Sequence, residues 1–485
     1  MKKLLALILT ALMLVSLLAC DSTPSGIDDD GDNTVKNDHT GDNTDNGGTN
    51  TDDSNLNTDT QICSTHDYVD NICSVCGCSL WNGETDTSWY SVVETEFNIA
   101  TAEQLAGLSE LVYSGVDFAN TVIILNTDID LNDIDWLPIG TSLEKPFSGI
   151  FDGNGHTVYN VKLSAGDDIG FFGYSVGNIE KIYVNNITIH CNMSEQVSVG
   201  GLIGWNDGNV SDCHVNVNID LQNGGGNIGG LIGHNNGNCE RSSANGTIKI
   251  DVMQNYGTYE DTFLGGLIGN HSDGTIKQGC FNGKLMCNAT REDENLNCEV
   301  VVGGFVGQAT ASGDEYIVIE NNYFEAEISA KTSNVDFIVG GFAGCLDNNN
   351  YLMVKNSYAI STINAEAALP DDHSWMSPDA HAAGLVGCVR GWDDINISNC
   401  WVDSNIILKT QNVTGYTGFV SYDCSDIEFS NIFYASNVIE ADEMLNTAGT
   451  PANFNDFKNL AFYVNRMKWD TEIWNLVDGE YPTLK

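Results

Sequence analysis

Basic residues and prolines are scarce in this sequence. Its 485 residues include 19 Lys and Arg against 67 Asp and Glu, which gives a formal net charge of −48. Nucleic-acid binding depends mostly on neutralising phosphates with Lys and Arg, so this balance argues against a nucleic-acid partner. It argues equally against charge-driven binding to anionic membrane surfaces, whereas calcium or another cationic partner stays open. The 7 prolines beside 50 glycines suit many tight corners in a sheet, not a proline-rich coil.

Helical spacing of apolar residues is absent from the middle of the chain, which excludes helical arrays of the ankyrin, TPR and HEAT types. A short glycine phrase repeats there instead, with a period of roughly 30 to 43 residues that is typical of a stacked array. The phrase reads Gly-Gly-Leu-Ile-Gly or a looser version, at residues 200–204, 229–233, 265–269, 303–307, 340–344 and 383–387. Its signature glycines are Gly201, Gly204, Gly230, Gly233, Gly266, Gly269, Gly304, Gly307, Gly341, Gly344, Gly384 and Gly387.

The stretches between the glycine phrases have the period of β-strands. Residues 215–219 alternate strictly between apolar and polar side chains, and Asn, Asp and Gly supply corners on either side. Each repeat is therefore expected to form about three short strands. A single coil cannot bury its own apolar face, but stacked coils pair equivalent strands and share one core. The sequence thus predicts an all-β solenoid.

Aligned copies of the phrase predict ladders of equivalent side chains. Two such ladders begin at Phe171 and Phe172 and continue through Leu202 and Ile203. Neighbouring strand residues point to opposite faces unless a corner intervenes. We expect the Leu202 ladder to be interior and the glycines to mark corners where a Cβ would clash. A third ladder consists of small residues that we interpret as buried: Cys213, Ser242, Cys280, Ser357 and Cys400.

Two pairs of cysteines within the repeats are placed so that they could form disulfides. Cys287 and Cys298 flank a polar insert and are the best disulfide candidates. Cys345 and Cys388 occupy matching places in adjacent coils, where a disulfide would be strained.

The first 60 residues are interpreted as a leader and a linker. Residues 1–20 combine two early lysines with an apolar stretch, which is typical of a signal peptide. Their end, Leu-Leu-Ala-Cys, resembles the lipobox of bacterial lipoproteins, which implies cleavage before Cys20 and lipidation of its sulfur. Residues 21–60 are Asp, Asn, Thr, Gly and Ser with almost nothing apolar, so we expect a disordered acidic stalk.

Residues 61–80 form a module rich in cysteine and histidine. Cys63 and His66 make a Cys-x2-His pair, and Cys73 and Cys76 make a Cys-x2-Cys pair, an arrangement that suits a tetrahedral structural zinc. Disulfide pairing is the alternative, because the chain is expected to be exported. We favour the metal, since a histidine has no role in a disulfide, although Cys78 is left over on that interpretation.

The remaining segments are expected to cap the solenoid, which we place at residues 141–440. Residues 95–140 hold the first strands and a helix that starts at a capping box, Thr101 with Gln104. Residues 441–485 are rich in Phe, Tyr and Trp, and we expect them to cover the last coil, with a carbohydrate-binding aromatic platform as the alternative.

The glycine phrase and the pattern after it resemble the GLUG-motif repeats of bacterial surface proteins, over roughly residues 145–435. Such repeats occur in some adhesin-like and IgA-peptidase-type proteins. The resemblance implies a right-handed parallel β-helix, here with an N-terminal capping helix and a C-terminal aromatic cap, exposed on the cell surface. The family carries no set of catalytic residues, so the resemblance transfers none.

The function expected from these observations is non-catalytic binding at the cell envelope. We expect a lipid-anchored protein on the extracytoplasmic face that mediates adhesion or binds a glycan or protein, with the lipid as its contact to the membrane. A carbohydrate-active β-helix enzyme, a lyase or hydrolase, is the alternative, and a structural spacer is a third. The inserts at 287–298 and 364–383 and the two ends are the expected sites of function. In the second insert, His373 and His381 could bind metal, but a polar surface loop is the simpler interpretation.

Overall fold

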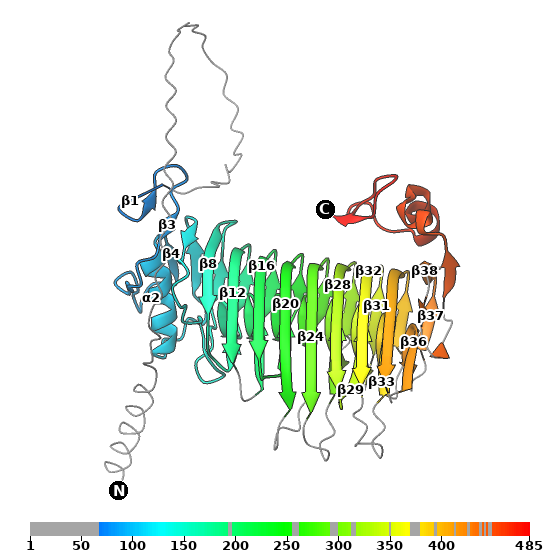
Figure 1. Cartoon of the computed structure of the whole chain (residues 1–485). Helices are drawn as coiled ribbons and strands as arrows, with labels where there is room; N and C mark the ends of the chain where they lie inside the picture. Colours follow the sequence, from blue (N-terminus) through cyan, green and yellow to red (C-terminus); the bar gives the residue numbers. More distant parts are fainter. Residues whose placement is uncertain are drawn as a thin grey trace, which may run out of the picture. The chain divides into compact units, whose positions relative to one another are not determined.

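The structure is a computed structural model of the whole chain, and it confirms a parallel β-helix (Figure 1). It describes residues 67–192, 196–254, 261–291, 299–311, 317–348, 351–368, 379–391, 395–411, 414–423, 427–435, 439–440, 443–444 and 449–485. The described residues belong to one compact unit, which starts at Gln61. The expected signal peptide, its Cys20 and the acidic stalk lie outside the described residues.

Each coil contributes strands to three sheets, as the coil around residue 200 illustrates. β13 (Val197–Gly200) and β14 (Ile203–Asn206) lie on either side of the glycine corner. β15 (Asn209–Ser211) and the longer β16 (His214–Gln222) complete the turn of the solenoid. Every one of these strands pairs in parallel with its equivalent in the next coil, as the stacking argument predicts.

We name the three sheets by their shape. The wide sheet contains, besides β16, the strands β1 (Tyr68–Val69), β2 (Ile72–Cys73), β3 (Ser79–Leu80), β6 (Ile129–Asp130), β8 (Thr157–Leu163), β12 (Tyr183–Asn192), β20 (Ser243–Gln254), β24 (Cys280–Arg291), β28 (Tyr323–Ser333), β32 (Tyr358–Ala368), β35 (Trp401–Gln411), β38 (Phe433–Ala435), β39 (Ile439–Glu440) and β41 (Thr450–Ala452). The short sheet contains, besides β15, the strands β4 (Glu96–Ile99), β5 (Val122–Leu125), β7 (Ile150–Asp152), β11 (Asn178–Glu180), β19 (Cys239–Glu240), β23 (Thr275–Lys277), β27 (Ile317–Glu320), β31 (Leu352–Lys355), β34 (Ile395–Ser398) and β37 (Ile427–Ser430).

The third, bent sheet turns at the glycine corners. It contains, besides β13 and β14, the strands β9 (Asp168–Ile169), β10 (Phe172–Ser175), β17 (Gly226–Gly229), β18 (Ile232–Asn235), β21 (Thr262–Gly265), β22 (Ile268–His271), β25 (Glu299–Gly303), β26 (Val306–Ala311), β29 (Asp336–Gly340), β30 (Ala343–Asn348), β33 (Asp379–Gly391), β36 (Thr414–Asp423) and β40 (Glu443–Met444). Its two arms meet at β33, which is long enough to pair with β29 and with β30.

The glycine corner explains how two adjacent ladders are both buried. Leu202 and Ile203 are each fully buried, so the predicted Leu ladder is interior and the Ile ladder is interior as well. The strand stops at Gly200 and restarts at Ile203, so the alternation of faces is reset between them. A Cβ on Gly201 would lie 2.5 Å from the carbonyl oxygen of Gly230 in the next coil. Glycine is therefore required where the backbones of adjacent coils approach most closely.

The ladder of small residues follows the short sheet. One of its predicted members is wrong by one residue. Cys213, Ser242, Ser357 and Cys400 are buried as expected. Cys280, however, pairs with Ser243 and begins β24, so Gly279 occupies the ladder position in that coil. The backbone N–H groups of the ladder donate to side chains of the next coil, for instance Cys213 to Ser242 Oγ at 3.1 Å.

The N-terminal end is closed by a helix, α2 (Ala102–Tyr113). The Thr101 side chain accepts the Gln104 N–H at 3.3 Å, and the Gln104 side chain accepts the Ala100 N–H at 2.9 Å. The reciprocal bond of the predicted capping box thus falls one residue earlier than expected. Leu105 and Leu108 are fully buried and belong to the main core, so the helix extends the core past the first coil.

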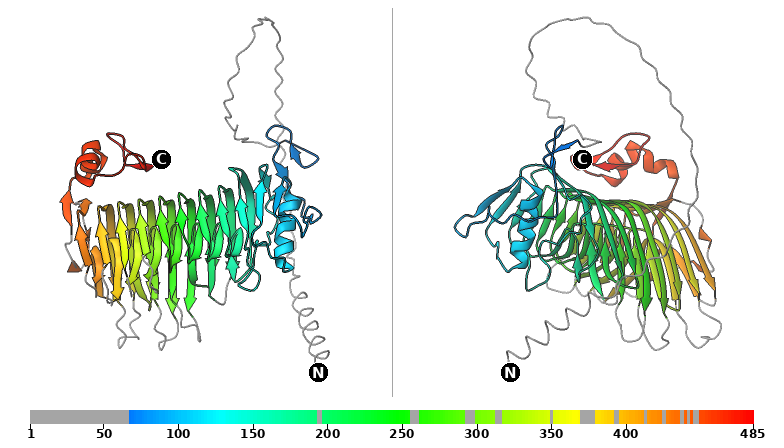
Figure 2. Two further views of the ribbon diagram at one scale, coloured as in Figure 1. Left: turned by 180° about the vertical axis from the view of Figure 1, so that it is seen from behind. Right: turned by 60° about the vertical axis from the view of Figure 1, so that its left-hand side comes forward.

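The C-terminal segment contains η2 (Phe454–Lys458), η3 (Phe462–Met467) and a hairpin of β42 (Trp474–Asn475) and β43 (Thr483–Leu484). β41 continues the wide sheet past β38, as an end strand would. The aromatic residues that follow pack instead against outward-facing rings of the wide sheet, a cluster that includes Tyr358 and Trp401. Figure 2 shows these red elements beside the later coils. The cap thus covers a flank of the solenoid, because the sheet directs large aromatic side chains outward there and the cap buries them.

Candidate functional site

The outer face of the wide sheet carries two rows of side chains that run along the solenoid, across the strands. We call the first the aromatic row, and its members pair in register: Thr157, Tyr183, His214, Ser243, Cys280, Tyr323, Tyr358, Trp401 and Phe433. We call the second the amide row, and it contains Asn216, Asn245, Asn282, Glu325, Ile360 and Asp403. Tyr159 and Asn185 pair with each other at its N-terminal end.

A shallow pocket of about 350 Å³ opens at the N-terminal end of both rows. We call it the N-terminal pocket, and its principal residues are Tyr159, Tyr183, His214, Asn185, Asn216 and Asn245. The rings of Tyr183 and His214 lie 4.9 Å apart and are inclined by 30°. Strands β8, β12, β16 and β20 supply the lining, so four successive coils build the pocket on a rigid sheet.

A β-bulge shapes this pocket. The register between β12 and β16 shifts between Val184 and Ile187, and Asn186 takes a left-handed conformation with φ of 63°. Its side chain donates to Asn160 Oδ1 at 2.7 Å, which holds the bulge in place. Bulges re-aim neighbouring side chains. Here the bulge lies directly beside Asn185 in the pocket wall.

His214 is held as a neutral ring. Its Nδ1 lies 2.8 Å from Ser243 Oγ. Burial lowers the pKa of His214, although the charge of Asp212 acts in the opposite direction. The imidazole is therefore uncharged at neutral pH, and one of its ring nitrogens is already occupied within the protein.

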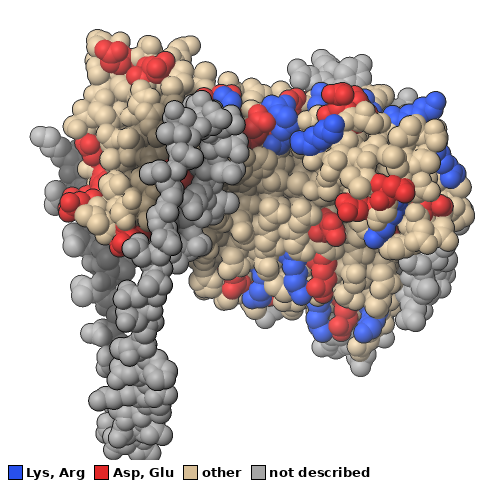
Figure 3. Space-filling view, turned by 90° about the horizontal axis from the view of Figure 1, so that it is seen from above, with Lys and Arg blue, Asp and Glu red and all other residues tan. Residues whose placement is uncertain are grey.

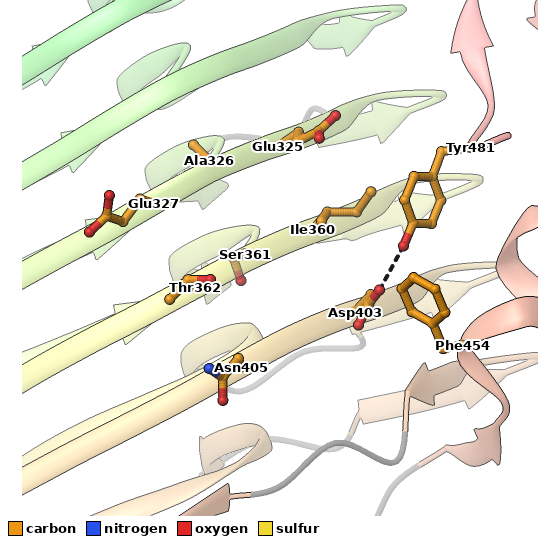
Figure 4. A pocket seen from close by; sticks show the side chains of 10 residues that line it. All are labelled: Glu325, Ala326, Glu327, Ile360, Ser361, Thr362, Asp403, Asn405, Phe454 and Tyr481. Carbon is orange, nitrogen blue, oxygen red and sulfur yellow. Dashed lines mark hydrogen bonds between the residues drawn. The ribbon is translucent and has the colours of Figure 1, made fainter.

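A second pocket, of about 330 Å³, lies between the wide sheet and the C-terminal segment (Figure 4). We call it the C-terminal pocket, and its principal residues are Glu325, Glu327, Ser361, Asp403, Phe454 and Tyr481. The Tyr481 hydroxyl donates to Asp403 Oδ2 at 2.8 Å. Glu327 is bridged to Lys284 at 3.2 Å, and Lys458 Nζ lies 4.4 Å from the centre of the Tyr481 ring. This pocket is thus acidic and aromatic, and lysines already lie against three of its members, Glu327, Tyr481 and Phe454.

The C-terminal segment itself stacks on the aromatic row. The Tyr358 and Trp401 rings lie 4.3 Å apart and nearly parallel, and Phe457 stacks on Trp401 at 4.5 Å. Tyr481 stacks on Trp401 at 5.7 Å, and the Tyr358 hydroxyl donates to the Pro482 carbonyl at 2.5 Å. The row is therefore covered by the chain itself in its C-terminal coils. In the N-terminal pocket the same row reaches solvent, where Tyr183 is 45% exposed.

The bent sheet carries neighbouring carboxylates that resemble an active site. Their contacts, however, lie within the protein. Glu299 and Asp336 are neighbours in register, and Arg390 Nη2 lies 2.6 Å from both oxygens of Glu299. Burial raises the pKa of Glu299 and of Asp336. We interpret Glu299 and Arg390 as an ion pair that links coils. Figure 3, seen from above, shows that basic and acidic side chains also lie beside one another elsewhere on the surface.

Asp168 lies in an environment that strongly disfavours its charged form. Burial, together with the nearby charges of Asp167 and Asp207, raises the pKa of Asp168 to about 7. Asp207 is oriented by two aromatic donors, Tyr174 at 2.6 Å and Trp205 at 2.8 Å. Asp168 is therefore partly protonated at neutral pH.

Half of the predicted zinc module lies within the described residues. Cys63 and His66 lie outside them. A turn closed by Gly77 N–H to the Cys73 carbonyl, at 2.9 Å, brings Cys73 and Cys76 to one loop, with Cys73 buried and Cys76 exposed. Among the residues that the structure describes, no group of three or more His, Cys, Asp or Glu is placed to hold a metal. The zinc clip stays a prediction.

The other predicted sites are only partly described. Cys287 is buried in β24, and burial raises its pKa to about 12, but its expected partner Cys298 lies outside the described residues. His373 also lies outside them, whereas His381 is buried in β33. No helix within the described part of the chain is both long and apolar enough to span a membrane.

The sequence interpretation did not identify either pocket. The aromatic row has a detectable signal, because Tyr358 and Trp401 directly follow the small-residue ladder at the same offset. The C-terminal pocket has none, since Tyr481 and Asp403 come together only through packing across 78 residues of chain.

The comparison with family models agrees with the repeat pattern. Residues 196–220 match the family model described as the GLUG motif, and they span almost one coil, from the start of β13 into β16. A candidate immunoglobulin A1 protease from Bacteroides ovatus, known from its crystal structure, is 18% identical, with a TM-score of 0.38 over 80% of this chain and 92% of that chain. A structure described as IgA1 protease is 16% identical, with a TM-score of 0.36 over 71% of this chain and 22% of that chain. No curated protein matches. The chain is a parallel β-helix protein that carries the GLUG motif at residues 196–220.

Proposed function

We propose that this protein is a lipid-anchored β-helix of the bacterial cell surface, which binds glycans or proteins without catalysing a reaction. The observation that carries this proposal is the outer face of the wide sheet. Two open pockets lie on it at opposite ends of the same two rows of side chains. A rigid face with aromatic rings and amides at fixed spacing is suited to holding an extended ligand.

Attachment to the membrane would depend on Cys20. Changing Cys20→Ala removes the sulfur that lipidation requires, so the variant should incorporate no labelled fatty acid and should leave the membrane fraction. Cys78→Ala is a matched control, because that cysteine lies in the folded part and should not affect fatty-acid incorporation. Lipid labelling that survives Cys20→Ala would contradict the anchor.

Binding is tested on the full-length protein displayed on cells or held in detergent micelles. The ligand panel contains host and bacterial glycans and extracellular matrix proteins. We expect specific binding to at least one of them, with saturation and competition by the free ligand. Lack of binding across the panel would instead favour a structural spacer.

The C-terminal pocket keeps the enzymatic alternative worth testing. Glu325 and Asp403 lie in one row two strands apart, a backbone separation of about 9.6 Å at the usual strand spacing. Inverting glycoside hydrolases hold two carboxylates at about 6.5–9.5 Å. Release of reducing sugar from acidic or neutral polysaccharides, abolished by Asp403→Asn and unaffected by Asp133→Asn, would establish hydrolysis and displace the non-catalytic proposal.

A further inference from the structure

We propose that the N-terminal pocket binds a neutral linear saccharide, laid along the solenoid axis with one sugar face on Tyr183. This inference rests on the proposed binding function and names the ligand class of that face. Three features of the pocket support it: an exposed ring, a set of amides from successive coils, and a lining without fixed charge.

The exposed ring provides the stacking surface. Tyr183 is 45% exposed, and the inclined His214 ring lies beside it in the next coil. Tyr159 adds a third ring one coil earlier on the amide row. Rigid aromatic side chains offer large contact areas at low entropic cost, and the apolar face of a pyranose ring is flat enough to lie on them.

The amides provide hydrogen bonds from successive coils. Asn185, Asn216 and Asn245 come from three successive coils, and all three are exposed. Adjacent strands are about 4.8 Å apart, so a ligand that runs along the axis meets one amide in each coil. An amide both donates and accepts, which matches the hydroxyl groups of a sugar.

The lining explains why the saccharide should be neutral. The nine residues that line the pocket include no Asp, Glu, Lys or Arg. The charged forms of acidic sugars would meet no cation in this pocket, and the chain as a whole carries a formal charge of −48. A cationic ligand would likewise find no carboxylate in the pocket wall.

The C-terminal cap shows that this row accommodates flat groups. Phe457 and Tyr481 stack on Trp401, which belongs to the same aromatic row as Tyr183 and His214. At the C-terminal end of the solenoid the row stacks against the cap. At the N-terminal end the row is open to solvent. A ligand in the N-terminal pocket would stack on the aromatic row in the same way that the cap residues stack on it.

The experiment titrates the full-length protein in detergent with cello-, laminari-, malto- and manno-oligosaccharides, by calorimetry. We expect saturable binding of at least one series. Tyr183→Ala should weaken that binding at least about tenfold, because it removes the central ring. Tyr183→Phe keeps the ring and should stay within about threefold, and Asn216→Ala should weaken binding about fivefold. Tyr113→Ala, an exposed tyrosine on α2, is the matched control and should bind normally.

The outcomes separate this inference from the broader function. Absence of binding to all four oligosaccharide series overturns the inference, even if the protein binds another glycan or a matrix protein. Binding that Tyr183→Ala and Asn216→Ala both leave unchanged places the ligand elsewhere and also overturns it. If Tyr183→Ala does not fold, as judged by circular dichroism, Asn216→Ala together with Tyr183→Phe decides the question. Failure of every ligand in the larger panel would reject the proposed function as well.

Discussion

At the scale of single residues, the stability of this fold depends on residues that lie against the backbone of the next coil. Glycines allow that close approach, and buried polar atoms satisfy the N–H groups that it leaves. Asp168 is an exception, because its partly buried carboxyl lies near two other acids and has a pKa of about 7. Such a group destabilises the fold when it ionises.

The expected result for Asp168→Asn is a gain in stability that depends on pH. The folded-state pKa lies above the unfolded value of about 4, so the contribution of Asp168 is fully present below about pH 4 and is lost as pH rises towards 7. The variant should match the natural protein near pH 4 and exceed it near pH 8. Urea unfolding midpoints at both pH values measure this. The control variant Asp133→Asn, at an exposed position, should leave the midpoint unchanged at both. A variant that is less stable at pH 8 would contradict the assignment.

The corner glycines make a sharper prediction. In Gly201→Ala the new Cβ would lie 2.5 Å from the Gly230 carbonyl oxygen, so we expect a loss of about 2–3 kcal/mol in the free energy of unfolding. Gly384 holds the same corner in a later coil, but a Cβ there would approach side-chain atoms, those of Val402 at 3.3 Å and of Ser404 at 3.6 Å. Gly384→Ala should therefore cost under about 1 kcal/mol. Equal losses in both variants, by denaturant titration, would show that the corner does not depend on backbone contact.

At the scale of elements, the strands were predictable and the docking of the cap was not. The strand period and the glycine spacing predicted the coils, because each coil repeats the same local sequence pattern. The alignment failed at Cys280, because that cysteine lies eleven residues after Gly269, whereas Cys213 lies nine residues after Gly204. The turn before β23 holds only one more residue than its equivalent before β19, so the interior position is Gly279 and Cys280 lies on the outer face.

The two pockets needed information that sequence periodicity does not contain. The N-terminal pocket depends on a β-bulge, which changes register without an obvious motif at Asn185. The C-terminal pocket depends on contacts such as Tyr358 with Pro482, across 124 residues. Aromatic composition indicated a cap, but only the exposed aromatic row determines which surface it covers.

Removing one ring from that row should release the cap. Trp401 is fully buried between the wide sheet and Phe457, so Trp401→Ala should cost about 3–5 kcal/mol and expose residues 449–485 to protease. Limited proteolysis followed by mass spectrometry of the C-terminal fragments measures the effect. Trp205→Ala is the comparison, because Trp205 stacks on Tyr174 and His234 near the other end, and its loss should leave the cap protected. Equal cleavage in the two variants would argue against the docking surface.

At the scale of the whole molecule, the solenoid behaves as a stack in which each coil contacts its neighbours. Deleting residues 230–265 removes one repeat and joins Gly229 to Gly266, so that Gly229 takes the place of its equivalent Gly265. We expect a folded protein that is shorter by about 4.8 Å. The C-terminal pocket should be retained, and in the N-terminal pocket Asn282 should take the place of Asn245, its equivalent in the deleted coil. Small-angle scattering and a single cooperative melting transition would check this. Deleting residues 230–247 removes part of a coil and should abolish cooperative melting; a folded product from it would contradict the modular description.

The close stacking of coils also bears on how the chain reaches its native state. Partner strands are separated by only 29 residues at Asn206 and Asn235, and by 43 at Asn356 and Asn399. These intervals do not grow as coils are added, so the entropy lost in closing each loop stays nearly constant along the molecule. Folding can therefore advance coil by coil from the helix-closed end, in the order in which the chain is synthesised. The tyrosine and tryptophan contacts of the C-terminal segment, which join residues up to 153 apart, would then form last and complete the process.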